Sequence, residues 1–94
     1  MMNDFQIKDF IAIHNVHQTF TKSFNSLLNQ NTAEDLNIND KNVSIDVENL
    51  EFELPGDDVI AFKSDINRDG NKIGYYRLVF ALNGKLLDDY FVIY

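Results

Sequence analysis

The chain has 94 residues, 45% of them hydrophobic, and its 15 acidic and 8 basic side chains give a formal net charge of −7. This length predicts a single domain, residues 1–94, and the apolar content is too high for a disordered chain. The negative charge disfavours direct binding to nucleic acid or to an anionic membrane, and the lack of cysteine excludes disulfides, a thiol nucleophile and thiolate metal sites.

The first predicted element is a helix over residues 4–29, because large side chains recur there every three or four residues. Asn3, followed three residues later by Gln6, predicts a capping box at its start. The stripe on one helix face consists of Phe10, Ile13, His17, Phe20, Phe24 and Leu27. Two alternatives stay open: apolar residues also alternate over residues 5–13, as in a strand, and a break near Asn15 is compatible with the pattern.

Residues 30–42 are rich in Asn and Asp and predict a connector. After it, apolar and polar residues alternate, which predicts an antiparallel sheet over residues 43–94. The alternation changes phase at Glu48-Asn49, so a bulge or a tight turn is expected there. A short strand over residues 59–62 precedes a predicted loop over residues 65–71.

The last two predicted strands, residues 73–82 and 85–94, form a hairpin around Asn83-Gly84. Both turn residues tolerate the positive φ of a two-residue type I′ turn. Such a turn places Leu82 opposite Lys85 and decides which side chains share each face of the hairpin.

The predicted fold is α+β, with one long N-terminal helix packed on a four-stranded antiparallel meander in the order α-β-β-β-β. This order resembles the cystatin-like arrangement, in which a curled sheet grips a helix; the resemblance is one of element order and carries no motif. Asp89 falls on the face toward the helix, where it requires an edge position or a partner. The residues expected between helix and sheet are Phe20, Phe24, Phe80 and Phe91.

The face of the last hairpin that points away from the helix is a candidate surface for binding a protein partner. It carries Tyr75, Arg77, Val79, Tyr90, Val92 and Tyr94. Tyr and Arg anchor protein interfaces because they bury a large area and keep a polar group. The alternatives are that another segment of the chain covers this face, or that its aromatic residues are ordinary surface side chains.

Four acids on the preceding strands, Asp46, Glu48, Glu51 and Glu53, alternate with apolar residues and are expected on the solvent side. A hydrated face is the simpler interpretation. A docking surface for a basic partner is the alternative.

Asp65, Asn67 and Asp69 match the first half of a calcium-binding loop, D-x-N-x-D-G. The later ligand positions carry Ile73 and Tyr76, neither of which supplies a carboxylate. An ordinary turn is therefore expected, and no metal site is predicted.

The sequence contains no recognisable catalytic motif or cofactor fingerprint, so neither an enzyme nor a cofactor is predicted. His14 and His17 lie three residues apart on the predicted helix, but a metal site needs a third ligand and the sequence offers no evident one. Histidines at the edge of the core are the expected interpretation.

Small size, acidity and an aromatic sheet face predict an inhibitor-like protein-binding module acting on a basic or nucleic-acid-handling protein, as toxin-immunity and phage anti-defence proteins do. The alternative is a homodimeric domain that holds a small apolar ligand between helix and sheet. A pocket at that place would favour the ligand, whereas a filled core and an exposed Tyr/Arg face would favour the partner. The N-terminus lacks a signal-peptide pattern and no apolar run is long enough to span a bilayer, so a cytoplasmic protein is expected.

Overall fold

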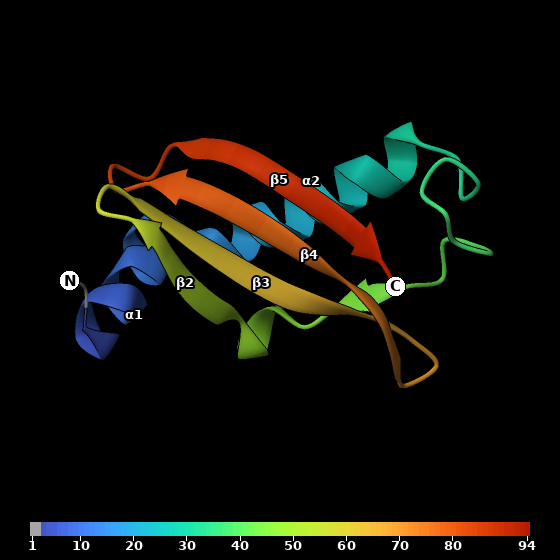
Figure 1. Ribbon diagram of the computed structural model, residues 1–94, viewed down its shortest axis with the longest axis horizontal. Coiled ribbons are helices and arrows are strands. Elements are labelled where there is room, and N and C mark those ends of the chain that lie inside the picture. The colour runs from blue at the N-terminus through green and yellow to red at the C-terminus, as the bar shows by residue number, and fades with distance from the viewer. Residues whose placement is uncertain (1–2) are drawn as a thin grey trace.

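The computed structural model describes residues 3–94 and shows an α+β fold, in which two helices pack on one face of an antiparallel sheet (Figure 1). The elements are α1 (Asp4–Ile13), α2 (Val16–Gln30), β1 (Ser44–Ile45), a 3₁₀ turn η1 (Val47–Asn49), β2 (Glu51–Gly56), β3 (Val59–Arg68), β4 (Asn71–Ala81) and β5 (Leu86–Ile93). Strands β2 to β5 form a meander, and the short β1 pairs with β3 beside β2. Within residues 3–94, neither helix is long and apolar enough to cross a bilayer.

The N-terminal region forms two helices, so the alternative of a break near Asn15 is confirmed. The prediction of one continuous helix is wrong, as is the alternative of a strand over residues 5–13. Asn15 adopts the left-handed conformation (φ 51°) and separates α1 from α2. Asparagine tolerates this conformation better than most residues, which explains the break at this position. The break leaves Ile13, a member of the predicted apolar stripe, 71% exposed. The predicted capping box at Asn3 is confirmed.

Aromatic side chains fill the space between the helices and the sheet. Phe20 and Phe24 of α2 and Phe80 of β4 are buried as predicted, whereas Phe91 is only partly buried because β5 is an edge strand. Phe10 of α1 extends this cluster, with its ring centroid 6.0 Å from that of Phe80. The helices therefore cover one face of the sheet and leave the other face to solvent (Figure 1).

A small polar group lies at the margin of this core. The Tyr76 hydroxyl hydrogen-bonds the Ser23 hydroxyl of α2. Burial raises the pKa of Tyr76, the nearby Asp89 carboxylate adds to the rise, and the hydrogen bond with Ser23 opposes it. Asp89 is exposed on the edge strand β5, so the prediction that it needs an edge position or a partner is confirmed.

The phase change in the first strand region is a tight turn, one of the two predicted alternatives. The chain makes a 3₁₀ turn over η1 and then continues in the same direction, because β1 and β2 both pair antiparallel with β3. The N–H of Asp46, just before η1, donates to the hydroxyl of buried Ser64 at 2.7 Å. This turn separates β1 from β2, so the sheet has five strands where four were predicted.

The predicted loop over residues 65–71 is wrong, because β3 continues to Arg68 and β4 begins at Asn71. Only Asp69 and Gly70 form the turn, with φ of 51° and 80°. Positive φ at two consecutive residues is the requirement of a type I′ turn in a two-residue hairpin, and Asp-Gly meets it. Strand β3 is therefore longer than the predicted strand over residues 59–62.

The last hairpin differs from the prediction near its turn and agrees with it further along. The loop has three residues: the N–H of Ala81 donates to the Lys85 carbonyl (2.8 Å), and Gly84 takes a φ of 93°. Leu82 is therefore not opposite Lys85. The bulge at Leu87 restores the predicted register, so the pairs from Val79 and Asp88 onward are those expected from the sequence.

Candidate functional site

The candidate site is the sheet face opposite the helices, which we call the outer sheet face. Its side chains form cross-strand rows: Glu51, Lys63, Arg77 and Tyr90; Glu53, Ala61, Val79 and Asp88; Asp65, Tyr75 and Val92; with Tyr94 following β5. No element within residues 3–94 covers this face (Figure 1). The register thus joins the six predicted partner-binding residues with two of the predicted acids, Glu51 and Glu53.

Arg77 lies near the middle of the outer sheet face. Its Nε donates to Oε1 of Glu53 at 3.4 Å, and its guanidinium carbon lies 5.4 Å from the centre of the Tyr90 ring. A planar guanidinium can pair with a carboxylate and stack on a ring at the same time. Arg77 is therefore fixed by two neighbours while its side chain stays partly accessible.

Tyr90 presents its ring at the exposed side of this group and is 43% exposed. Its hydroxyl donates to Oδ2 of Asp88 at 3.0 Å. This hydrogen bond and the Asp88 charge raise the pKa of Tyr90, while the positive charge of Arg77 opposes the rise. Tyr90 is thus a hydrogen-bonded ring held in a defined orientation.

A second cation–aromatic pair joins Lys63, in the same row as Arg77 and Tyr90, to Tyr75 in the neighbouring row. Lys63 Nζ is 3.6 Å from Oε2 of Glu51 and 5.3 Å from the centre of the Tyr75 ring. Together with Arg77 and Tyr90, Lys63 and Tyr75 surround a shallow depression of about 470 Å³. The depression therefore has aromatic walls and paired charges.

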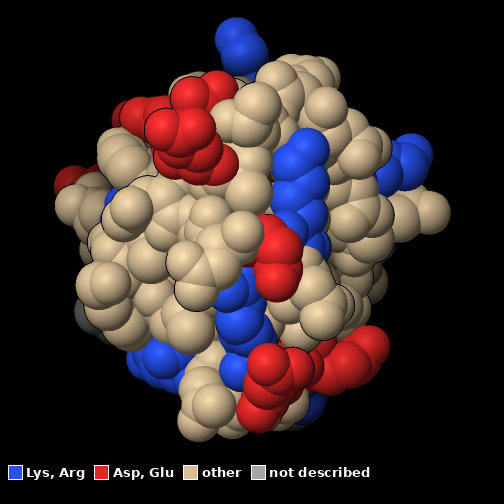
Figure 2. Space-filling view, turned by 90° about the vertical axis from the view of Figure 1, so that its right-hand side faces the viewer, with Lys and Arg blue, Asp and Glu red and all other residues tan. Residues whose placement is uncertain are grey.

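Tyr94 extends the outer sheet face toward the C-terminal end and is 70% exposed. Lys72 Nζ lies 5.7 Å from its ring centre and 3.1 Å from Oδ1 of Asp65. The hydrogen bond to Asp65, followed by that to Tyr94, raises the pKa of Lys72. Figure 2 looks onto this end of the molecule, where basic side chains form a band with acidic side chains beside it. The surface is therefore a mixture of both charges.

The four predicted acids do not form one surface. Asp46 precedes η1, where its Oδ2 accepts a hydrogen bond from Asn49 Nδ2 (2.7 Å), and Glu48 lies within η1. The prediction that both lie on strands is wrong, because the phase change is a turn. Only Glu51 and Glu53 belong to the outer sheet face, where each pairs with a basic side chain.

The candidate calcium ligands lie on the β3–β4 hairpin, whose register shifts between Ile66 and Asn67. Asp65 and Asn67 are strand residues of β3, and Asp69 lies in the turn. The Asp65 carboxylate binds Lys72 instead of pointing into a loop. In the described part of the chain, no group of three His, Cys, Asp or Glu side chains is arranged to hold a metal ion.

The two histidines lie on either side of the helix break. The His14 ring has its centroid 4.5 Å from that of Phe10, with the two planes tilted by 54°. It also packs against Gly84, where a β-carbon would overlap it. His17 lies in the first turn of α2, directly after Val16, and is partly exposed. His14 therefore fastens α1 to the last hairpin.

Lys63 and Asp88 are the site residues that sequence reasoning missed. Lys63 joins the site only through the pairing of β3 with β4, and Asp88 through its bond to Tyr90. Asp69-Gly70 signals the turn that joins β3 to β4, but the register shifts by one residue between Ile66 and Asn67, so the turn alone does not predict that Lys63 lies opposite Arg77.

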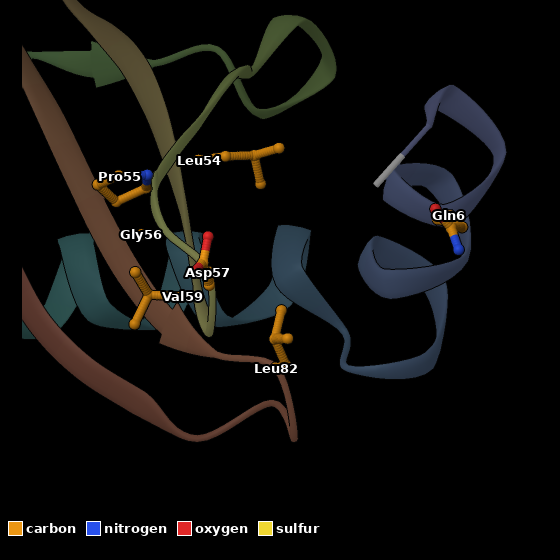
Figure 3. A pocket seen from close by; sticks show the side chains of 7 residues that line it. All are labelled: Gln6, Leu54, Pro55, Gly56, Asp57, Val59 and Leu82. Atoms are coloured by element: carbon orange, nitrogen blue, oxygen red, sulfur yellow. The ribbon is translucent and has the colours of Figure 1, made fainter. Parts of the chain in front are cut away.

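A cleft of about 640 Å³ opens at the other end of the sheet (Figure 3). It lies between α1, which contributes Gln6, and strand ends that contribute Leu54, Val59 and Leu82. The cleft is outside the aromatic core and does not separate α2 from the sheet.

No protein-family model, curated protein or solved structure matches the chain. The class that the fold and the site define is an acidic α+β domain with a mixed aromatic and ionic sheet face.

Proposed function

We propose that this protein is a non-enzymatic protein-binding module that docks through its outer sheet face and inhibits a basic or nucleic-acid-handling protein. The observation that carries the proposal is the group of Arg77 and Tyr90, held by Glu53 and Asp88 on a face that no element in residues 3–94 covers. Interface anchors are most effective when their orientation is set before binding, because less side-chain entropy is lost.

The charge of the molecule supports a basic partner. The net charge is −7, and the exposed carboxylate of Asp88 stands beside Tyr90 without an ion pair to any described basic side chain. Complementary charge accelerates association and excludes partners of like charge. Toxin-immunity and phage anti-defence proteins work in this way, and a cysteine-free chain suits action in the cytoplasm.

The packing between helices and sheet favours this function over a homodimer with an apolar ligand. Phe20, Tyr76, Leu78 and Phe80 are almost entirely buried at that place and fill the space a ligand would need. The cleft at the sheet end is open and lies outside the core. A partner on the outer sheet face requires no rearrangement of these side chains.

The test begins with capture of the partner from the native cell and continues with purified components. Arg77→Glu and Tyr90→Ala should each weaken binding at least about tenfold, because they remove central anchors. Lys22→Glu is the control for Arg77→Glu, because Lys22 is an exposed residue of α2 and its substitution makes the same charge change on the helix side of the sheet. Sedimentation velocity on the same variants shows whether the partner is a second copy of the chain.

Thermal melts of each variant separate loss of binding from loss of fold. Folded Arg77→Glu and Tyr90→Ala proteins that bind as tightly as the parent would contradict the proposal. Equal loss with Lys22→Glu would also contradict it, because binding would then depend on total charge alone.

A further inference from the structure

The free edge of the sheet runs along β5. In the described chain β5 pairs only with β4, so the opposite side of the strand has no neighbour. Leu86, Leu87 and Tyr90 on this strand are exposed, as is Tyr94 directly after it. An exposed edge of this length is a template for another strand unless the chain blocks it.

In an antiparallel pair of strands, every second residue of β5 directs its backbone groups toward β4, and the residues between direct theirs away. This alternation shows which backbone groups of β5 have no partner strand. The N–H of Tyr94 donates to the Ile73 carbonyl at 2.9 Å, so alternate residues before Tyr94 also direct their backbone groups toward β4. The residues in between, Asp89, Phe91 and Ile93, therefore direct their N–H and C=O groups away from the sheet.

The first half of this edge is blocked from within the chain. The register shifts at Leu87, and Oδ1 of Asp88 accepts the N–H of Asp89 at 2.8 Å. A bulge and an edge carboxylate both oppose strand addition. The second half, at Phe91 and Ile93, has regular pairing and no such side-chain acceptor in the described chain.

Two carboxylates lie beside the unblocked half of the β5 edge, and their charge favours an incoming strand that is basic. Asp88 and Asp89 are adjacent and exposed, and neither forms an ion pair within residues 3–94. A second copy carries the same net charge of −7, so like-charge repulsion opposes its approach to this acidic edge. A strand with Lys or Arg beside these acids would gain opposite-charge pairs instead.

We propose that an extended basic segment of the partner adds to the free edge of β5, with main-chain hydrogen bonds to Phe91 and Ile93 and basic side chains beside Asp88 and Asp89. This inference rests on the proposed function and names how its partner is recognised. Because β5 borders the outer sheet face, the added strand would extend that face next to Tyr90 and Val92.

The experiment titrates the full chain with a synthetic peptide of alternating Lys and Val and follows backbone amides by NMR. Binding should shift the amides of Phe91 and Ile93 and slow their hydrogen exchange by about tenfold or more. A peptide with Glu in place of Lys should not bind, and one with Pro at alternate positions should lose the effect, because it lacks main-chain donors.

Variants of the protein test the charge argument. Asp89→Lys should weaken binding of the Lys/Val peptide about tenfold or more, whereas Asp9→Lys on α1, an equal charge change, should not. Binding of the Pro peptide or the Glu peptide as tight as that of the Lys/Val peptide would overturn the inference, as would an equal effect of the two variants.

The position of the shifts distinguishes this inference from the proposed function. Shifts on the outer sheet face without protection of Phe91 and Ile93 overturn strand addition and leave the proposed docking face standing. Absence of any binding by the Lys/Val peptide overturns strand addition alone, since binding of the captured partner is tested separately.

Discussion

Arg77 shows how a single side chain can be prepared for binding by its neighbours. Glu53 holds the guanidinium at one edge and the Tyr90 ring lies against it. Both contacts are made within the free protein, so the proposed partner would meet an ordered cation and an ordered ring. The entropy cost of fixing these two side chains has then been met before association.

The hydrogen bond between Tyr90 and Asp88 predicts a specific titration. The pKa of Tyr90 is raised, so the folded state holds this proton more tightly than the unfolded chain does. The contribution to stability is therefore present below the pKa of a free tyrosine and is lost as pH rises through the folded pKa. NMR titration of the ring should show Tyr90 ionising at higher pH than a free tyrosine, and Asp88→Ala should lower its pKa; an unchanged pKa in this variant would contradict the assigned cause.

Phe24 tests the packing of α2 on the sheet. Its ring is buried against those of Tyr76 and Phe91, so Phe24→Ala leaves a cavity that should lower the free energy of unfolding by about 3–5 kcal/mol. Urea unfolding measures the loss. Phe5→Ala is the control, because Phe5 is 80% exposed and its removal should change stability by less than about 0.5 kcal/mol. Equal stability of the two variants would show that α2 is not packed as described.

At the scale of elements, one helix break and one side-chain contact position the helices on the sheet. Asn15 ends the regular stripe, and the contact of His14 with Gly84 fastens α1 to the last hairpin. Because of the break, α2 presents Val16, Phe20 and Phe24 to the sheet in a phase that one straight helix would not give.

The conformation of Asn15 leads to a matched pair of substitutions. Its side chain makes no capping hydrogen bond, so Asn15→Gly should leave stability almost unchanged. Asn15→Val should cost about 1–2 kcal/mol, because a β-branched residue is strained in the left-handed region. Urea denaturation of both proteins measures the difference, and equal stability would show that the break does not depend on this backbone conformation.

At the scale of the whole molecule, local sequence signals predicted the class of the fold but not the pairing between segments that are distant in sequence. Alternation and helical spacing predicted an α+β arrangement with the correct aromatic core residues of α2 and β4. The pairs of β4 with β5 from Val79 and Asp88 onward were also correct, although the predicted turn at Asn83-Gly84 was one residue short and the bulge at Leu87 compensated for it.

The remaining features depend on contacts between distant segments. The ion pair between Glu53 and Arg77 forms only because the β2–β3 and β3–β4 registers together bring these two side chains close. Asp65 and Asn67 favour loops by composition, yet the buried Ile66 between them and the turn at Asp69-Gly70 keep them in a strand. Tertiary packing outweighs local preference at these positions.

The central claim is that a partner docks on the outer sheet face, and cross-saturation NMR of the protein bound to its captured partner tests it most directly. Saturation should pass to amides of β3, β4 and β5 around Lys63, Arg77 and Tyr90, while amides of α1 and α2 stay unaffected. Transfer centred on the helices, or on the cleft lined by Leu54 and Leu82, would contradict the account.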